Sequence, residues 1–222
     1  MTADDVLEFW FQQCRPWQWF RRRDSFDALV RERFGEAVER ALAGDLNHWS
    51  CSPSSGLALV LLLLDQFPRQ IWRGEAKAFA GDPQALQLSL EALERGWIAA
   101  ESQRPRRQFW LMPQLHSEDV SVLRAVIPLL ERHVDEATAN VACRHLAELE
   151  RFGRYPRRNL ALVRMSSPEE TAFLNAAPGS RSGSVLPPQS MRPVENAGDG
   201  HGPAGAKPHR GVAGAEANGS AR

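Results

Sequence analysis

Residues 57–74 read LALVLLLLDQFPRQIWRG, an apolar run from Leu57 to Leu64 that ends abruptly at Asp65. Because the run would be apolar on every side of a helix, it predicts a helix enclosed by other helices rather than one lying on a surface. It is much shorter than the roughly 20 residues that a membrane-spanning helix needs. Pro68 lacks a backbone N–H and disfavours helical geometry in the residue before it, so we expect this helix to end or kink there. The stretch therefore predicts a core helix with a polar end.

The sequence on both sides of this stretch carries helical patterns. Thr2 and Asp5 can cap a first helix, and apolar residues recur at helical spacing from Phe26 to Leu42, with Gly44 after them. Further start signals predict helices that open near Asp82, at Ser117 as N-cap, near Asp135 and at Ser167. Residues 101–108 suggest a polar loop, and Pro113 and Pro128 suggest a break and a kink. No strand pattern of useful length occurs, so we expect an all-α fold of about seven or eight helices, arranged as helix hairpins.

Past Ala176 the composition changes to glycine, proline, alanine and serine, with almost no large apolar residue. Such a segment buries too little apolar surface to offset the entropy lost on ordering. We therefore expect an all-helical domain over residues 1–176 and a disordered tail over residues 177–222.

The bulk composition restricts which classes of binding partner and which cellular compartment we expect. The chain has 222 residues and is 43% hydrophobic, enough for one domain core, and its 27 Lys and Arg balance its 27 Asp and Glu. Without a global basic field, we expect neither nucleic acid nor a membrane as a partner. Cys14, Cys51 and Cys143 share no metal-ligand spacing, and the N-terminus lacks the pattern of a secretory signal. These features favour a cytoplasmic protein without a disulfide framework or a zinc site.

The segment Arg15–Asp24, RPWQWFRRRD, mixes three aromatic residues with four arginines. Aromatic faces can stack on bases and arginines can bind phosphates, so the segment resembles a short nucleic-acid-binding stretch. A nucleic-acid surface normally needs a broader basic patch, however. We therefore expect these aromatic side chains to pack on the core and the arginines to remain in solvent.

Polar residues gather at the predicted helix ends in three blocks far apart in the sequence. Arginine guanidiniums bind carboxylate or phosphate through paired hydrogen bonds, and a histidine beside such an anion can act as a general acid or base. The candidate ligand-binding residues are Asp65, Arg69, Arg73, His116, Ser117, Glu118, His145, Arg151, Arg154, Arg158 and Asn159. We expect the ends of the blocks to converge on one rim, with His116 beside a helix N-terminus and Arg69, Arg154 and Arg158 near it.

Three classes of function are compatible with these residues. One is a module that binds an anionic small molecule or the acidic end of a peptide, and another is a hydrolase that uses His116 or His145 with arginines as electrostatic stabilisers. The third is an interaction scaffold in which Asp65 and Glu118 neutralise the arginines in a structural ion network. The oligomeric state is open.

The sequence carries no motif for a cofactor or a metal. There is no GxSxG elbow, phosphate-binding glycine loop or dinucleotide fingerprint, so we expect no cofactor. His116, Glu118 and Asp119 lack the spacing of helical metal ligands, and the neighbouring arginines would repel a cation. We therefore expect no metal site.

Four blocks stand in order along the chain: LLLLDQFPRQIWRG, AFAGDPQAL, MPQLHSED and RFGRYPRRN, preceded by FWF and followed by SSPEE. Together, over residues 4–176, they resemble the bacterial DUF924 family, a domain of unknown function. The resemblance implies a tetratricopeptide-like helical array and no established activity.

The chain departs from the family pattern at a few positions. The family usually has Asn where this chain has Gln70, and His where it has Arg157. It also usually has an acidic residue near the preceding helix's histidine, where Ala147 or Glu148 stands here. If that histidine and acid are catalytic in relatives, these departures imply that this chain lacks the activity.

Overall fold

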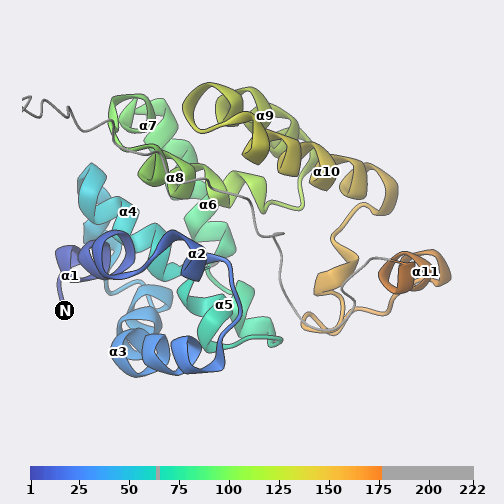
Figure 1. Cartoon of the computed structure of the whole chain (residues 1–222), viewed down its shortest axis with the longest axis horizontal. Coiled ribbons are helices and arrows are strands. Elements are labelled where there is room, and N and C mark those ends of the chain that lie inside the picture. Colours follow the sequence, from blue (N-terminus) through green and yellow to red (C-terminus); the bar gives the residue numbers. More distant parts are fainter. Residues whose placement is uncertain (64–65, 177–222) are drawn as a thin grey trace, which may run out of the picture. The chain divides into compact units, whose positions relative to one another are not determined.

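The computed structural model of the protein describes residues 1–63 and 66–176. Over these ranges every regular element is a helix and there are no strands, which confirms the all-α class (Figure 1). The expected disordered tail, residues 177–222, and the pair Leu64 and Asp65 lie outside the described residues. The α-helices are α1 (Ala3–Glu8), α2 (Pro16–Trp19), α3 (Asp24–Leu42), α4 (Pro53–Leu63), α5 (Phe67–Ile71), α6 (Asp82–Glu94), α7 (Trp97–Ala100), α8 (Arg104–Leu115), α9 (Val120–His133), α10 (Glu136–Phe152) and α11 (Pro168–Ala176).

These helices outnumber the seven or eight that the sequence predicts because several are single turns, such as α2, α5 and α7. Short segments of other helical types connect them. They are a π-helix, η1 (Phe9–Gln13), and three 3₁₀ turns, η2 (Asn47–Cys51), η3 (Ala76–Phe79) and η4 (Pro156–Arg158). None of the helices in the described ranges is both long and apolar enough to cross a membrane.

Helix α4 is the predicted core helix. Leu57, Leu61 and Leu62 are almost completely buried, and α4 packs against α1, α3, α5, α6 and α8. A Cβ at Gly56 would lie 3.0 Å from Cη2 of Trp110, so the absence of a side chain there lets the indole ring approach the helix closely. The next helix, α5, starts at Phe67 with Pro68 in its first turn, a position where the missing N–H costs no hydrogen bond.

An aromatic layer joins the N-terminal helices to the core. Phe34 and Phe67 stack with their ring centroids 4.8 Å apart, and Trp10 meets Phe67 edge-on at 5.1 Å. Trp19 packs edge-on against Phe109 at 5.1 Å and donates from Nε1 to the carbonyl oxygen of Trp10 at 2.9 Å. These rings fix η1, α2, α3, α5 and α8 around one apolar centre.

The expectation that all the aromatic residues of Arg15–Asp24 pack on the core is wrong for Trp17. Trp19 is 4% exposed, whereas Trp17 is 51% exposed. Because the two tryptophans are only two residues apart on the single turn α2, they point in different directions. Only one of them can face the core.

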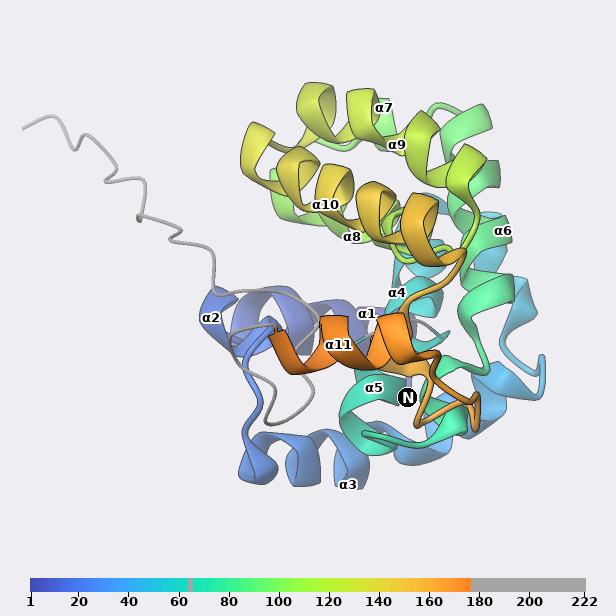
Figure 2. The same cartoon turned by 90° about the vertical axis from the view of Figure 1, so that its right-hand side faces the viewer.

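Helices α8, α9 and α10 follow one another through short connections and lie side by side (Figures 1 and 2). Gly153, at φ 70°, ends α10 as predicted, because glycine adopts the left-handed conformation without a steric penalty. At the start of α11, Ser167 and Glu170 exchange hydrogen bonds with each other's backbone N–H, which confirms the predicted capping box.

Two predicted boundaries around α8 are wrong. The helix begins at Arg104, inside the predicted loop, because Pro105 is tolerated in a first turn and the residues after it favour a helix. It then continues through Pro113, which lies inside the helix rather than at a break.

The N-cap of α9 is Asp119 rather than Ser117. The Oδ1 atom of Asp119 accepts from the backbone N–H of Ser121 at 2.7 Å and of Val122 at 3.3 Å. Aspartate caps a helix as well as serine does, so the sequence offered two equivalent starts. His116 is therefore the C-cap of α8, and not a neighbour of the first turn of α9.

Candidate functional site

Two arginines from distant parts of the chain approach one carboxylate. Arg69 of α5 donates from Nη2 to Oδ2 of Asp82 at 3.0 Å, and Nη1 of Arg158 in η4 lies 3.6 Å from the same oxygen. Asp82 is the first residue of α6. Both guanidiniums are buried, so this ion pair forms largely out of water, where charges interact strongly.

The protein also holds both guanidiniums through other contacts. Arg69 donates to the carbonyl oxygen of Ala78 at 3.0 Å, and Arg158 donates to the carbonyl oxygen of His116 at 2.8 Å. The guanidinium carbons lie 4.4 Å (Arg69) and 5.1 Å (Arg158) from the ring centroid of Phe79. The two cations are thus fixed in position, and each ties secondary structure elements together.

Burial lowers the pKa of Arg69 to about 10, with Asp82 raising it and Arg158 lowering it further. Its side chain therefore still carries a positive charge near neutral pH. The charge of Arg69 adds to that of Arg158 in a region of low dielectric constant.

Two histidines lie beside these arginines. The rings of His116, at the end of α8, and His145, in α10, have centroids 6.4 Å apart. Burial lowers the pKa of His116 well below its ordinary value, and the charges of Arg69 and Arg158 lower it further. Both the low dielectric and the nearby cations therefore hold this imidazole in its neutral form.

Burial also lowers the pKa of His145, to about 4, with the carbonyl of Leu115 opposing the shift and Arg158, Arg144 and Arg157 adding to it. The Nδ1 atom of His145 lies 3.5 Å from the carbonyl oxygen of Leu115. A neutral ring that donates from Nδ1 to this carbonyl has Nε2 as its acceptor atom.

Tyr155 closes one side of the cluster. Its hydroxyl donates to the same Leu115 carbonyl at 3.3 Å, and its ring meets that of His145 with centroids 5.2 Å apart. Burial raises the pKa of Tyr155, so the phenol keeps its proton. The Leu115 carbonyl oxygen, at the end of α8, thus accepts hydrogen bonds from two side chains, His145 of α10 and Tyr155 in the segment after α10.

Glu148 is the acidic group next to His145 on α10. Burial raises its pKa, while Arg157 and Arg158 oppose the shift and Glu118 adds to it. Glu148 is half-buried, whereas Ala147 is exposed. Of positions 147 and 148, only position 148 therefore carries an acid in this chain, and that acid interacts with Arg157 and Arg158.

We use the name anion cluster for Arg69, Arg158, His116 and His145, four of the predicted site residues, which the structure brings together. Three other predicted arginines form ion pairs elsewhere. Arg73 pairs with Asp27 at 2.9 Å, Arg151 with Glu169 at 2.8 Å and Arg154 with Glu170 at 2.7 Å. The expected convergence of Arg154 with His116 does not occur, because Glu170 at the start of α11 holds the Arg154 side chain.

The remaining predicted residues stabilise local structure. Glu118 accepts from Arg164 at 2.7 Å and from the backbone N–H of Tyr155 at 2.9 Å, so its carboxylate is bound directly to Arg164, and the charge of the buried Arg158 also acts on it. Ser117 Oγ accepts from the backbone N–H of Asp119 at 3.1 Å. Asn159 donates to Ser166 Oγ at 3.1 Å. Asp65 lies outside the described residues.

Sequence reasoning missed Asp82, Tyr155 and Glu148. Asp82 followed by proline is typical of a helix start, and Asp82 does begin α6. That role accounted for the residue fully, so its contact with the arginines was not predicted. The positions of Tyr155 and Glu148 follow from the packing of η4 and α10 against the end of α8. For Glu148 two signals were available: its helical spacing of three residues from His145, which places both on one face, and the family resemblance, which has an acid where Ala147 or Glu148 stands.

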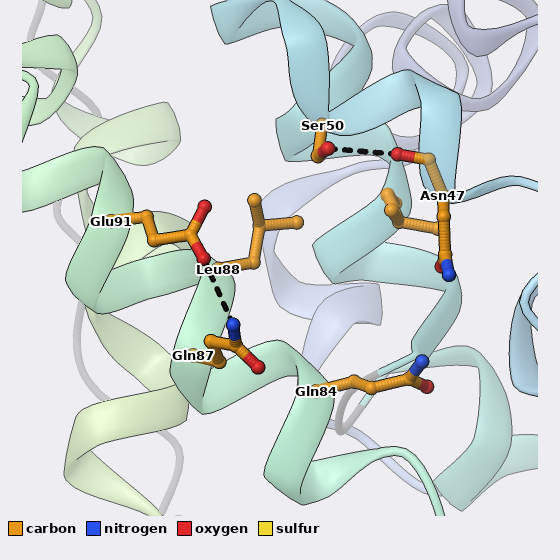
Figure 3. A pocket seen from close by; sticks show the side chains of 7 residues that line it. Asn47, Ser50, Gln84, Gln87, Leu88 and Glu91 are labelled. Carbon is orange, nitrogen blue, oxygen red and sulfur yellow. Dashed lines mark hydrogen bonds between the residues drawn. The ribbon is translucent and has the colours of Figure 1, made fainter.

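Two concave regions of the surface lie outside the anion cluster. One, of about 220 Å³, is lined by Leu59 and Leu88 and by polar side chains of η2 and α6 (Figure 3). The other, of about 500 Å³, is lined by Trp17, Arg21, Arg22 and Arg23. Within the described part of the chain, no group of three or more His, Cys, Asp or Glu side chains is arranged to hold a metal ion.

Comparisons with known proteins agree with the resemblance noted above. A family model described as a bacterial protein of unknown function, DUF924, matches residues 6–178. The solved structure of ATU0120, a protein of unknown function from Agrobacterium tumefaciens, is similar at 36% identity and a TM-score of 0.73, and the match covers 79% of this chain and 97% of that one. None of the curated proteins matches. By its sequence over most of its length, this chain is a member of the DUF924 family.

Proposed function

We propose that this protein binds a small anionic group, a carboxylate or a phosphate of a small molecule or the acidic end of a peptide, at the anion cluster. The observation that carries the proposal is that the buried Arg158 guanidinium is bound to the main-chain carbonyl of His116, and that its charge adds to burial in lowering the pKa of both His116 and His145. A positive potential at two neutral imidazoles favours an anion, which can accept hydrogen bonds from guanidinium and imidazole groups.

The anion would approach from the side of His145. His145 and Glu148 are half-buried and Arg157 is exposed, while Arg69 and Arg158 are buried beneath them and already hold Asp82 and main-chain carbonyls. The exposed Arg157 would therefore supply a direct contact, and the buried arginines would contribute their charge from below. Glu148, with its raised pKa, would take up a proton as the anion binds, which removes a like charge.

Calorimetric titration with phosphate, sulfate and a panel of mono- and dicarboxylates tests the proposal. We expect at least one of these anions to bind the parent protein, and the Arg157→Gln variant to bind it at least about tenfold more weakly. Arg124→Gln is the matched control, because Arg124 is an exposed arginine that pairs with Glu150. If no anion binds, or if both variants lose affinity equally, the cluster is not an anion site.

A hydrolase that uses His145 is the second candidate. The observation in its favour is a neutral imidazole with a lowered pKa beside a carboxyl group with a raised pKa, a combination found at sites of proton transfer. Tests of ester and phosphoester hydrolysis with the parent protein and with His145→Ala would identify such an activity. Equal rates for the two proteins would exclude His145 as its general base.

An interaction scaffold is the third candidate, and the ion pairs of Arg69 and Arg158 with Asp82 favour it. Consecutive packing of α8, α9 and α10 supports the proposal that the helices form a tetratricopeptide-like array of hairpins.

The free thiols of Cys14, Cys51 and Cys143 support a reducing, cytoplasmic location.

A further inference from the structure

A concave surface between α2 and α3 combines one aromatic side chain with three cations. Trp17, Arg21, Arg22 and Arg23 line it, and it is a hollow of about 500 Å³ that is open to solvent. All four side chains are exposed. This surface, called the Trp17 surface below, involves none of the residues of the anion cluster.

Trp17 is exposed, whereas the two aromatic residues that follow it, Trp19 and Phe20, are buried and half-buried. Trp19 packs against Trp10 and Phe109, and Phe20 stacks on Phe109 with centroids 6.1 Å apart. Exposing half of an indole ring forgoes much of the free energy that burying the ring would contribute. An exposed aromatic ring framed by cations is instead suited to stack on a planar ligand.

The cations around Trp17 are available to a ligand. The guanidinium carbon of Arg23 lies 5.4 Å from the indole centroid, so this cation already sits at the ring. The acid that follows them in the chain, Asp24, approaches Arg22 at 3.6 Å, but both side chains are exposed and such pairs are weak. Three guanidiniums beside one weakly held carboxylate favour a ligand with several negative charges.

We propose that the Trp17 surface binds a nucleoside phosphate, with the base stacked on the indole ring and the phosphates held by Arg21, Arg22 and Arg23. The volume lies within the range of 300 to 1,000 Å³ that is typical of small-molecule sites. The lining residues come from α2 and from the short connection after it. That extent matches a single base with its phosphates rather than a strand, since a single-strand site usually tracks about 4 to 16 nucleotides.

Titration of the full-length protein with ATP and with its separate parts tests the proposal. The probes are ATP, AMP, adenosine, inorganic triphosphate and a six-nucleotide single-stranded oligonucleotide, at low and at moderate salt. We expect ATP to bind at least about tenfold more tightly than either adenosine or triphosphate, since both parts contribute. We also expect the affinity to fall as salt rises, because guanidiniums supply the phosphate contacts.

Substitutions on the surface separate stacking from charge. We expect Trp17→Ala to weaken ATP binding about fivefold or more, in line with the value of one base–aromatic stack, and Trp17→Phe to retain most of the affinity. Arg21→Ala and Arg22→Ala should each weaken ATP binding and leave adenosine binding unchanged. Because these side chains are exposed, the variants should melt like the parent protein, and Arg124→Ala, on α9, is the control.

Several results would overturn the proposal. Equal affinity for triphosphate and ATP, with no effect of Trp17→Ala, would mean that arginines alone attract anions there. Binding of the oligonucleotide more than about tenfold more tightly than ATP would identify a single strand as the ligand. Equal binding of an acidic peptide, or no binding of ATP at low salt, would also reject a nucleotide site.

Discussion

Arg158 donates a hydrogen bond from Nη2 to the main-chain carbonyl oxygen of His116 at 2.8 Å, across 42 positions of sequence. His116 is the C-cap of α8, so its carbonyl belongs to the group that a helix end leaves without internal partners. A guanidinium at this end also interacts favourably with the helix dipole. The contact fastens η4 to α8 and holds His116 in place.

Removing this side chain should therefore destabilise the fold. We expect Arg158→Met to lower the free energy of unfolding by roughly 3–5 kcal/mol, because it leaves a buried helix end and Asp82 without this partner. Urea denaturation measures the change. Arg124→Met, in an exposed pair with Glu150, should cost less than about 1 kcal/mol. A loss below about 1 kcal/mol for Arg158→Met would show that Arg158 is not structural and would strengthen the case for a ligand role.

The low pKa of His145 predicts a dependence of stability on pH. Because the folded pKa is about 4 and the ordinary value is 6.5, the unfolded chain binds more protons between these values. The contribution of neutral His145 to stability is complete above pH 6.5 and decreases as the pH falls towards 4. NMR titration should give a midpoint near 4 for His145, and Arg157→Gln should raise it. A midpoint near 6.5 would contradict the positive potential on which the proposed anion site depends.

Glu170 should make the stability of α11 depend on pH in a more acidic range, because its carboxylate is stabilised by hydrogen-bond donors. Hydrogen bonds from Arg154 and from the backbone N–H of Ser167 lower its pKa from 4.5 to about 2. Its contribution to the folded state is therefore present above pH 4.5 and is lost as the pH falls through about 2. Amide exchange in α11 should accelerate over this range in the parent protein. The same range should have little effect in Glu170→Gln, which is less protected throughout.

Leu61 tests the enclosure of α4. It is 1% exposed, so Leu61→Ala should cost about 2–5 kcal/mol through lost burial and the cavity left behind. Leu29→Ala is the control, because Leu29 lies on the solvent side of α3 with 45% of its surface exposed. Thermal or chemical denaturation of the two variants should differ clearly. Similar losses would mean that α4 can collapse around the missing side chain.

Val163 should tolerate a change that favours its backbone conformation. Its φ of 54° is left-handed, which is unfavourable for a β-branched residue, and its side chain is 91% exposed. Asparagine adopts this conformation more readily, so Val163→Asn should raise the free energy of unfolding by roughly 1 kcal/mol. Val163→Thr keeps the β-branch and should have little effect. Destabilisation by the asparagine would indicate that the valine makes a contact that offsets its strain.

Local signals carried the prediction of the helices. The apolar run of α4, the capping box of α11 and Gly153 after α10 each determine structure through interactions within a few residues, so one sequence is enough to recognise them. The predicted start of α9 was wrong because two residues were equally good as its N-cap. Ser117 and Asp119 are both good N-caps, and in the structure Asp119 caps α9.

The candidate site could be predicted only in part for the same reason. Residue types and their positions at helix ends pointed to Arg69, Arg158, His116 and His145. The local sequence does not determine, however, which acid pairs with which of the many arginines. Arg154 and Glu118 were expected in the cluster, yet their side chains bind Glu170 and Arg164. Which acid lies within about 4 Å of which arginine depends on how helices pack, because these contacts cross tens of residues.

The sequence by itself determined the helical class, the central helix and the DUF924 resemblance, because apolar periodicity, capping residues and ordered motifs are local properties of the chain. Tertiary structure alone decided that Asp82 joins Arg69 to Arg158 and that Trp17 faces solvent while Trp19 faces the core. The physical reason is that burial and charge pairing depend on distances between elements. Those distances exist only once the helices have packed.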